Sequence, residues 1–301
     1  MNISVVIPVY KKSEMLMRHL RHNMPYMSEY EIIIVDDASD EKIKEQVKKE
    51  FPQIIVLENE KNMGFAPTVN KGIYHAHGDF VLLLNSDVKL IHPFHDSYFK
   101  RFKDDKDIFA ISFMQKERDG SYVGKNRIYF EDGFPKHCKS SDHESGLNGW
   151  AEGGSCIIRM DYLKKLGGFS AIYAPFYWED IDLSYRAYSK GWYVMFDPKI
   201  VVEHHHESTV GSFFSKKHVK AIAYRNQFLF TWINMTDAIY SNQHLSSLPK
   251  HILKALLRGD MEFLSGMIKA LSVFTQVISL RERKKKLQAV SDKEIFQKFA
   301  A

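Results

Sequence analysis

The chain has 301 residues, of which 45% are hydrophobic and 13% aromatic, a composition that excludes a disordered protein and allows a large buried core. The net charge is only +5, and the last 21 residues hold seven Lys/Arg against three Asp/Glu, so we predict a basic tail and no nucleic-acid partner. Two cysteines, Cys138 and Cys156, are too few for a disulfide framework or a cysteine zinc site, and we expect both in the core. The first residues lack a signal-peptide pattern, so we expect a cytoplasmic protein.

Strand and helix patterns alternate along the first two thirds of the chain. Short apolar or β-branched runs predict strands at 3–10, 30–40, 53–59, 79–87, 154–160 and 192–198. Amphipathic or charged stretches between them predict helices at 13–27, 40–50, 67–75 and 161–167. The polar segment 116–149 reads as loops with a small hairpin. This order predicts an α/β fold with a mostly parallel sheet covered by helices on both faces.

Beyond about residue 211 the pattern becomes helical. One face of a helix is predicted by the spacing of Phe263, Met267, Leu271, Phe274 and Ile278. The run "RERKKK" follows, and two interpretations remain open. The segment lies on an anionic membrane surface, or it packs as a subdomain against the rest of the chain or a second subunit. Glu262 and Lys269 argue against a transmembrane helix.

Polar side chains gather where the predicted parallel strands end. These positions are Pro8 and Tyr10, Asp36 and Asp37, Asn59 to Asn62, and Asn85 with Asp87. In an open α/β sheet the ligand crevice lies at these carboxyl ends. The segment "PVYKKSE" after the first strand has no glycine, which excludes a dinucleotide-binding turn, and no Walker A loop is present in the sequence.

An acidic crevice that holds a nucleoside diphosphate needs a divalent cation, because carboxylates and phosphates otherwise repel each other. Asp87 is the best placed ligand, although a turn aspartate is the alternative. The segment "VVEHHHES" adds imidazoles, of which His204 alone, or the alternate pair His204 and His206, can reach one site. Surface histidines are the alternative.

The segment "FYWEDIDLSYR" places three carboxylates within four residues. A helix that starts near Asp180 would use this residue as its N-cap and would pair Asp182 with Arg186 four positions on. That structural interpretation leaves Glu179 and Asp180 beside Trp178 without evident partners. Acids crowded in a partly apolar cleft have raised pKa values, as a general base requires.

Taken together, "VVIPVY", "IIIVDDASD", "NMGFAPTVNKGI", "LLLNSDV", "GGSCIIRMDYLKKLGGF", "FYWEDIDLSYRAYSKGW" and "DPKIVVEHH" resemble the family 2 glycosyltransferases, which have the GT-A fold. The resemblance is most specific to bacterial members that build surface polysaccharides, including rhamnosyltransferase-like ones. It implies a catalytic domain at 1–210, with a nucleotide-binding half at about 1–90 and an acceptor and catalytic half at about 91–210. A helical extension would occupy 211–301.

The resemblance also implies an inverting transfer from a UDP- or dTDP-sugar to a glycan or lipid-linked acceptor, with Mn²⁺ or Mg²⁺ as cofactor. Asp180 corresponds to the catalytic base, and we expect Glu179 to orient the acceptor or the base. Asp87 corresponds to the metal aspartate of an Asp-x-Asp element whose first position is Asn85 here. His204 resembles the histidine that completes the metal or diphosphate site, with His205 as an adjacent competitor.

The remaining site residues implied by the resemblance fall into two groups. At the nucleotide we expect Pro8, Tyr10, Asp37, Asn62, Gly64, Asn70, Asn85 and Ser86. Val69 stands where relatives often have arginine, so a diphosphate contact there would come from Asn70, Lys71 or the backbone. At the donor or acceptor sugar we expect Trp150, Gly153, Gly154 and Trp178, with one of the two tryptophans in the core.

Two other functions compete with this one. A nucleotidyltransferase shares a sheet and an acidic metal site, but it usually has a Gly-rich loop with Arg or Lys after its first strand. A non-catalytic subunit that binds a sugar nucleotide or carbohydrate would explain Asn85 as decay of the metal motif, while the presence of Asp87, Asp180 and His204 argues against decay. The oligomeric state stays open, with a homo-oligomer as one possibility.

Overall fold

The computed structural model describes residues 1–94, 99–204 and 213–300, which form three consecutive parts. The first part contains β1 (Ile3–Val9), α1 (Ser13–Met27), β2 (Glu31–Asp36), α2 (Ile43–Glu50), β3 (Ile55–Glu58), α3 (Phe65–His75), β4 (Phe80–Leu84) and β5 (Val88–Leu90). The second contains α4 (Lys100–Asp104), β6 (Ile108–Lys116), β7 (Tyr122–Val123), β8 (Asn126–Glu131), β9 (Phe134–Lys139), β10 (Gly146–Leu147), β11 (Ser155–Arg159), α5 (Met160–Leu166), η2 (Ala171–Tyr173), α6 (Glu179–Ser189) and β12 (Tyr193–His204). The third contains α8 (Lys216–Asn234), α9 (Ala238–Arg258), α10 (Met261–Leu271), α11 (Phe274–Leu287) and α12 (Asp292–Gln297).

A ten-stranded sheet runs through the molecule in the order β10-β12-β6-β11-β4-β1-β2-β3, with β5 added to β12 and β7 to β6. Neighbours from β4 to β3 are parallel, as are β6 and β12. Strand β11 is antiparallel to both of its neighbours, β4 and β6. The expected α/β fold with a mostly parallel sheet is therefore confirmed.

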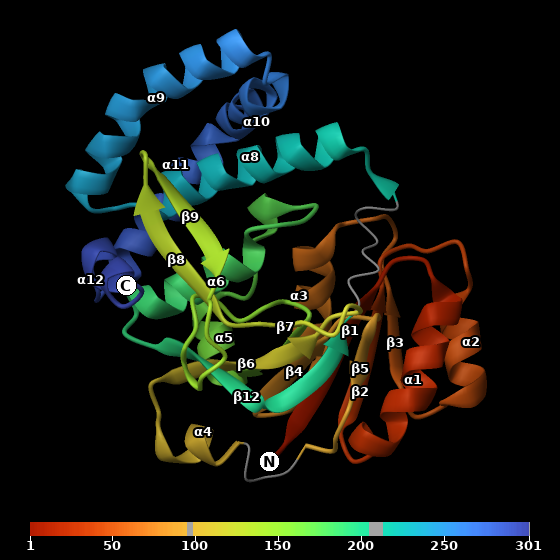
Figure 1. The fold of residues 1–301 in the computed structure, drawn as a ribbon. Helices are drawn as coiled ribbons and strands as arrows, with labels where there is room; N and C mark the ends of the chain where they lie inside the picture. Colours follow the sequence, from red (N-terminus) through yellow and green to blue (C-terminus); the bar gives the residue numbers. More distant parts are fainter. Residues whose placement is uncertain (95–98, 205–212, 301) are drawn as a thin grey trace.

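The two faces of the sheet are buried by different helices, as the alternation of side chains along a strand requires. Val5 and Ile7 of β1 pack with α1, α2 and α4, whereas Val6 packs on the opposite face with α3, α5 and α6. All three residues are buried, so β1 lies at the centre of the fold with helices on both sides (Figure 1). This arrangement leaves the strand ends as the place where polar groups can gather.

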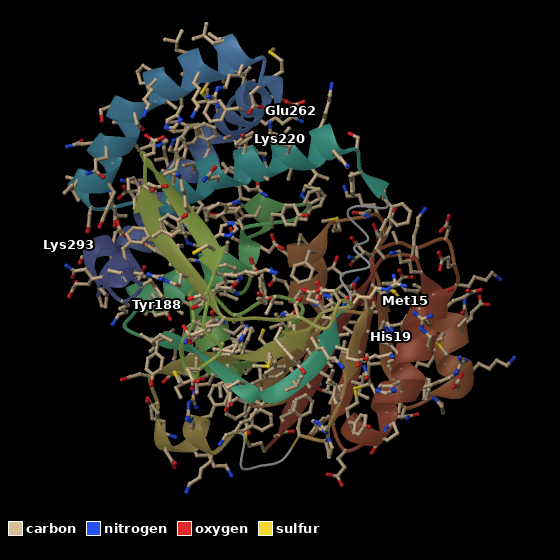
Figure 2. All side chains as sticks on the ribbon, viewed as in Figure 1. Met15, His19, Tyr188, Lys220, Glu262 and Lys293 are labelled. Atoms are coloured by element: carbon tan, nitrogen blue, oxygen red, sulfur yellow. The ribbon has the colours of Figure 1, made fainter. Side chains whose placement is uncertain are left out.

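The C-terminal helices pack against elements of the middle part of the chain, residues 99–204. Helix α8 packs against α6 and the β8–β9 hairpin, while α10 and α11 pack on α8, and α12 returns to α6 and β8 (Figure 1). Lys220 of α8 and Glu262 of α10 lie where these two helices meet (Figure 2), and Nζ of Lys220 lies 2.9 Å from Oδ1 of Asp260. Within the described ranges, no single helix has the length and hydropathy of a membrane span, and α10 with α11 does so only as a pair bent by 70°.

Two local expectations are wrong. The apolar stripe from Phe263 to Ile278 does not lie on one helix, because the chain bends after Leu271 and α11 starts only at Phe274. Cys138 is exposed on β9, and only Cys156 is buried in the core.

Candidate active site

A cleft of about 400 Å³ opens at the carboxyl ends of β1, β2 and β4. Its walls come from segments far apart in the chain: Pro8 to Tyr10, Asp37, Asn62, Gly64, Phe65, Thr68, Asn85 to Asp87, Trp150, Glu152 to Gly154, Pro175 to Tyr177, Glu179, Asp180, His204 and Phe214. The polar strand ends identified in the sequence therefore meet the carboxylate turn at one cavity.

Asp37 organises the wall of the cleft formed by the first half of the chain. Its carboxylate accepts hydrogen bonds from the backbone N–H groups of Met63 (2.8 Å) and Gly64 (2.9 Å) and from Nδ2 of Asn59 (2.8 Å). Gly64 has φ +83, and a Cβ there would lie 2.8 Å from the backbone of Pro175, so only glycine fits. Asp37 thus holds the loop that brings the two halves together at the cleft.

Asp87 and His204 face each other because two strands are paired in a particular register. Strand β5 starts directly after Asp87 and pairs with the end of β12, with Val88 opposite His204. As a result, Oδ1 of Asp87 lies 3.2 Å from Nε2 of His204. Both side chains line the cleft. His205 and His206 lie outside the described residues.

Helix α1 holds the loop that carries Asp87. His19 points from α1 towards this loop (Figure 2), and its Nδ1 donates to the carbonyl oxygen of Ser86 at 2.8 Å. Asn23, one turn further along α1, donates to the carbonyl oxygen of Val88 and accepts from the backbone N–H of Leu90, both at 2.9 Å. Burial lowers the pKa of His19, which favours the neutral ring in this position.

The turn before the acidic residues is strained and is held by the C-terminal part. Tyr177 and Trp178 have φ values of 73 and 75, a left-handed conformation that costs a bulky residue about 1–3 kcal/mol. Asn226 of α8 is fully buried, and its Nδ2 lies within 2.7–2.9 Å of the carbonyl oxygens of Tyr173, Phe176 and Tyr177. Helix α8 therefore fixes the backbone that aims the next two residues at the cleft.

Helix α6 starts at Glu179, and its N-cap position is Trp178, so Asp180 is not the N-cap that the sequence predicted. Asp180 lies in the first turn, where Oδ1 accepts from the backbone N–H of Ile181 at 2.8 Å and Oδ2 from that of Gly153 at 3.4 Å. Burial is the main cause that raises the pKa of Asp180 to about 6, and the negative charge of Glu152 contributes to the same shift. A carboxyl group with this pKa can exchange a proton near neutral pH.

Glu179 is buried beside Asp180, and among the described residues its Oε2 has no hydrogen-bond partner. Burial, followed by the charge of Asp180, raises the pKa of Glu179 well above its usual range. A buried polar atom without a hydrogen-bond partner destabilises the folded state by about 1–3 kcal/mol. Such an atom in a cleft is typical of a group that serves function rather than packing.

Asp182, the third acid of the turn, points the other way into the protein. Its carboxylate accepts from Nε of Arg186 (2.7 Å), from the hydroxyl of Tyr173 (3.0 Å) and from Nδ2 of Asn234 (2.8 Å). The predicted pair of Asp182 and Arg186 is therefore present, and this acid is committed to packing.

Gly153 and Gly154 form the wall of the cleft between the Asp87–His204 pair and Asp180. A Cβ on Gly154 would lie 2.8 Å from Nδ2 of Asn85 and 3.0 Å from Cε1 of His204. A Cβ on Gly153 would lie 2.9 Å from the ring of Phe65. Both positions exclude a side chain, and this keeps the middle of the cleft open.

Most of the predicted site residues line the cleft, but Asn70 and Trp178 do not. Asn70 exchanges hydrogen bonds with the backbone of Phe169, at 2.7 and 2.9 Å. Trp178 is buried against His137 and Phe230, whereas Trp150 lines the cleft. The lining residues that were not predicted from the sequence are Val9, Phe65, Thr68, Glu152, Pro175, Phe176, Tyr177 and Phe214. For Glu152, the only available signal was its position directly before the two glycines.

The residues present fit a divalent cation. The described residues contain no group of three or more His, Cys, Asp or Glu side chains arranged for a metal, and Asp87 and His204 are two such side chains that face each other at the cleft. Magnesium-type ions are commonly held by one or two protein ligands together with substrate phosphates and water. A pair that faces an open cleft suits this kind of shared coordination.

The sequence between residues 4 and 167, more than half of the chain, matches the family model described as glycosyl transferase family 2. A dolichyl-phosphate beta-glucosyltransferase of Trichomonas vaginalis is 33% identical over 97 residues, which cover 28% of this chain and 30% of that protein. A poly(ribitol-phosphate) beta-glucosyltransferase of Bacillus spizizenii is 38% identical over 96 residues, which cover 29% of this chain and 15% of that protein. The matched segments thus span less than a third of each relative.

The fold is also shared with solved structures. The crystal structure of GalNAc-T7 with UDP, GalNAc and Mn²⁺ superposes with a TM-score of 0.64 at 17% sequence identity, over 91% of this chain and 57% of that one. At this identity the likeness concerns the fold, and it confirms the expected GT-A architecture.

Proposed function

The chain belongs to glycosyl transferase family 2, and from this premise we propose that it moves a sugar from a nucleoside-diphosphate sugar to a hydroxyl group of a glycan or lipid-linked acceptor in surface polysaccharide synthesis. The observation that carries the proposal is the cleft itself, where the Asp87–His204 pair and the raised-pKa carboxyl of Asp180 line one cavity. The proposed donor is a UDP- or dTDP-sugar, and the transferred group is a hexosyl or rhamnosyl unit.

The proposed reaction is a single displacement with inversion. The acceptor oxygen forms a bond to the anomeric carbon as the bond from that carbon to the diphosphate oxygen breaks. The proton of the acceptor hydroxyl passes to Oδ1 or Oδ2 of Asp180, and the nucleoside diphosphate leaves with the electron pair. Glu179, buried beside Asp180, orients the base or the acceptor.

The metal part of the proposal names Asp87 and His204 as the protein ligands of Mn²⁺ or Mg²⁺. When bound, the cation would neutralise negative charge on the leaving diphosphate. Asn85 and Ser86, on the same loop as Asp87, would contact the diphosphate, while Pro8, Tyr10, Asp37, Asn62 and Gly64 would line the base and ribose pocket.

A thermal-shift screen of UDP-, dTDP-, GDP- and CMP-sugars, each with Mn²⁺, Mg²⁺ or EDTA, tests the donor and the cofactor. A ligand that binds only the folded state raises the melting temperature by mass action. We expect one nucleotide class to stabilise the wild-type protein, and we expect this effect to vanish with EDTA and in Asp87→Ala. If a well-folded chain gains no stability from any donor, the proposal is wrong, and a scaffolding role takes its place.

A lipid-linked acceptor lies at a membrane surface, so the proposal includes peripheral attachment on the inner face of the cell membrane. Helix α9 supports it because it is apolar on two sides. One side, with Ala255, packs inward, while the other exposes Leu245, Leu253, Leu256 and Leu257, the last at 79%. Met261, Ile268, Leu271, Phe274 and Ile278 of α10 and α11 are exposed as well.

The charge of this segment favours an anionic lipid surface over a second copy of the chain. From residue 238 to 287 there are nine Lys/Arg against three Asp/Glu. The net charge of this segment is therefore +6, compared with +5 for the whole chain. Lys254, Arg258 and Lys269 are exposed beside the apolar side chains. A two-fold contact would bring these cations against their own copies, whereas anionic lipids attract them.

Co-sedimentation with vesicles tests the attachment. We expect the chain to bind vesicles of phosphatidylcholine with phosphatidylglycerol, and to bind pure phosphatidylcholine weakly. The variant Leu253→Ser/Leu256→Ser/Leu257→Ser should lose binding, while Tyr74→Ser, which removes an exposed aromatic ring from distant α3, should retain it. Unchanged binding of the triple variant, or its conversion of a dimer to a monomer, would contradict membrane attachment.

A further inference from the structure

Gln115 lies near the end of β6, fully buried, between two side chains that line the cleft, Glu152 and His204. Its Oε1 lies 2.7 Å from Nδ1 of His204, and its Nε2 donates to Oε2 of Glu152. Oε1 of Glu152 accepts a second hydrogen bond, from Nδ2 of Asn126 at 2.7 Å. One amide group therefore connects the Asp87–His204 pair with the carboxylate of Glu152, which also lines the cleft.

The orientation of this amide is determined by its neighbours. The carboxylate of Glu152 can only accept, so the NH₂ group of Gln115 must face it, and the carbonyl oxygen must face His204. That oxygen requires a hydrogen on Nδ1 of His204. In the neutral ring, the lone pair is then on Nε2, the atom that lies 3.2 Å from Oδ1 of Asp87.

Glu152 is fixed from behind in the same way. Two amide groups, from strands β6 and β8, each donate to one of its oxygens, so the carboxylate cannot rotate without losing one of them. The side chain still lines the cleft next to Gly153 and Gly154. A carboxylate that accepts two hydrogen bonds still has lone pairs for further donors. The hydroxyl groups of a sugar are such donors, and hydrogen bonds to a charged acceptor are strong.

We propose that Glu152 binds sugar hydroxyls in the cleft and that Gln115 is a positioning residue, which aims Nε2 of His204 at the divalent cation and Glu152 at the sugar. The inference rests on the proposed function for the identity of the cation and the sugar. Because one amide serves both residues, metal binding and the position of Glu152 are coupled: a change at either end of Gln115 alters the other.

Titration of the full chain with Mn²⁺ in the absence of any sugar nucleotide, followed by electron paramagnetic resonance of free Mn²⁺, tests the positioning role. Gln115→Leu keeps the size of the side chain and removes both hydrogen bonds. We expect it to weaken Mn²⁺ binding by about 10- to 100-fold, as loss of a hydrogen bond behind a metal ligand usually does. Glu152→Ala should weaken it too, although the carboxylate of Glu152 is not proposed as a ligand.

Gln227→Leu is the matched control. Nε2 of Gln227 also donates a hydrogen bond inside the protein, at 2.9 Å to the carbonyl oxygen of Pro135, but the residue does not line the cleft. It should keep the wild-type Mn²⁺ affinity. Circular dichroism identifies variants that do not fold, and Gln115→Glu, which has the same shape but cannot donate to Glu152, serves as a second variant in that case.

The outcomes distinguish a failure of the positioning role from a failure of the proposed function. Wild-type Mn²⁺ affinity in folded Gln115→Leu and Glu152→Ala would overturn the positioning role while leaving the proposed function intact. A wild-type chain that binds no Mn²⁺ would overturn the metal part of the proposed function, and the inference with it. In steady-state kinetics, Glu152→Ala should raise KM for the donor or for the acceptor more than it lowers kcat. An unchanged KM for both substrates would contradict sugar binding by Glu152.

Discussion

Helix α6 carries acidic side chains on two sides, and the hydrogen-bond partners of these acids differ between the two sides. Towards the interior, Asp182 receives three donors from three elements, including a guanidinium group. Towards the cleft, Asp180 receives only backbone N–H groups, and Glu179 keeps one oxygen without a partner among the described residues. Desolvation opposes charge on both sides, but only the interior side compensates for it with a cation.

A second buried acid follows the interior pattern. Asp292, at the start of α12, accepts from Nζ of Lys284 at 3.1 Å, from the hydroxyl of Tyr185 at 2.8 Å, and from backbone N–H groups at Thr236 and Asp237. The comparison teaches that this fold supplies partners where an acid serves packing. At Glu179 and Asp180 it supplies no cationic partner, and both acids line the cleft.

The largest effect should come from the cleft side. Asp180→Asn removes the proton acceptor and retains the shape, so we expect kcat to fall by about 10²- to 10⁴-fold, as for loss of a general base. The release of nucleoside diphosphate measures it, and the melting temperature should stay equal or rise, since a desolvated charge has been removed. A variant with near wild-type turnover would remove Asp180 from the reaction.

On the interior side, the same helix should respond in stability. Asp182→Ala leaves Arg186, Tyr173 and Asn234 without their shared acceptor, so the free energy of unfolding should fall by about 3–5 kcal/mol. Urea denaturation gives this value. The kcat of the fraction that remains folded should stay within a few-fold of the wild-type value, and a selective loss of kcat at full stability would reverse the assignment of the two sides.

The pH dependence should sharpen the contrast. Because the pKa of Asp180 is raised to about 6, kcat/KM should fall about tenfold per pH unit below 6 as the base becomes protonated. Between about pH 4 and 6 the folded state holds a proton that the unfolded state has lost, so the contribution of Asp180 to stability falls as the pH rises. Across this range the melting temperature should fall less, or rise more, with increasing pH in Asp180→Asn than in the wild type, and an equal pH dependence would contradict the raised pKa.

The smallest effect is expected for an exposed version of the Asp182–Arg186 pair. Asp161 and Lys165 of α5 have the same spacing, with an Oδ2–Nζ distance of 3.5 Å, and both are exposed. Asp161→Ala should change the free energy of unfolding by about 0.5 kcal/mol or less, as surface pairs usually do. If urea denaturation gave losses as large as for Asp182→Ala, burial would not be the cause of the difference.

The sheet and its ligand edge were predictable because strand periodicity and strand ends are local properties. Asp37, Asn85 and Asp87 each follow a recognisable strand, and parallel strands bring such ends together. The role of Glu152 was not predictable in this way, since it depends on Gln115 and Asn126, which lie 37 and 26 positions away. No local pattern records such partners.

Other misjudged positions have similar causes. Trp178 follows an aromatic run that favours a sugar-binding surface, but its left-handed backbone turns the ring into the core. The bend between α10 and α11 contains neither Gly nor Pro, and the apolar spacing continues across Ser272 and Val273, so periodicity could not detect it. Within "RERKKK", Lys284 is buried, and its partners Asn234, Thr236 and Asp292 all lie outside this run.

The contacts of Asn226 set a boundary for anyone who recombines this chain with its relatives. A crossover near residue 210 would separate the acidic turn from the amide that holds its carbonyl groups, even though every residue lining the cleft up to His204 would be retained. A crossover after α8, in the 235–237 connection, keeps the turn and its support on one parental sequence. Helices α9 to α12 would then be exchanged together, which keeps Lys284 of α11 and Asp292 of α12 on one parental sequence.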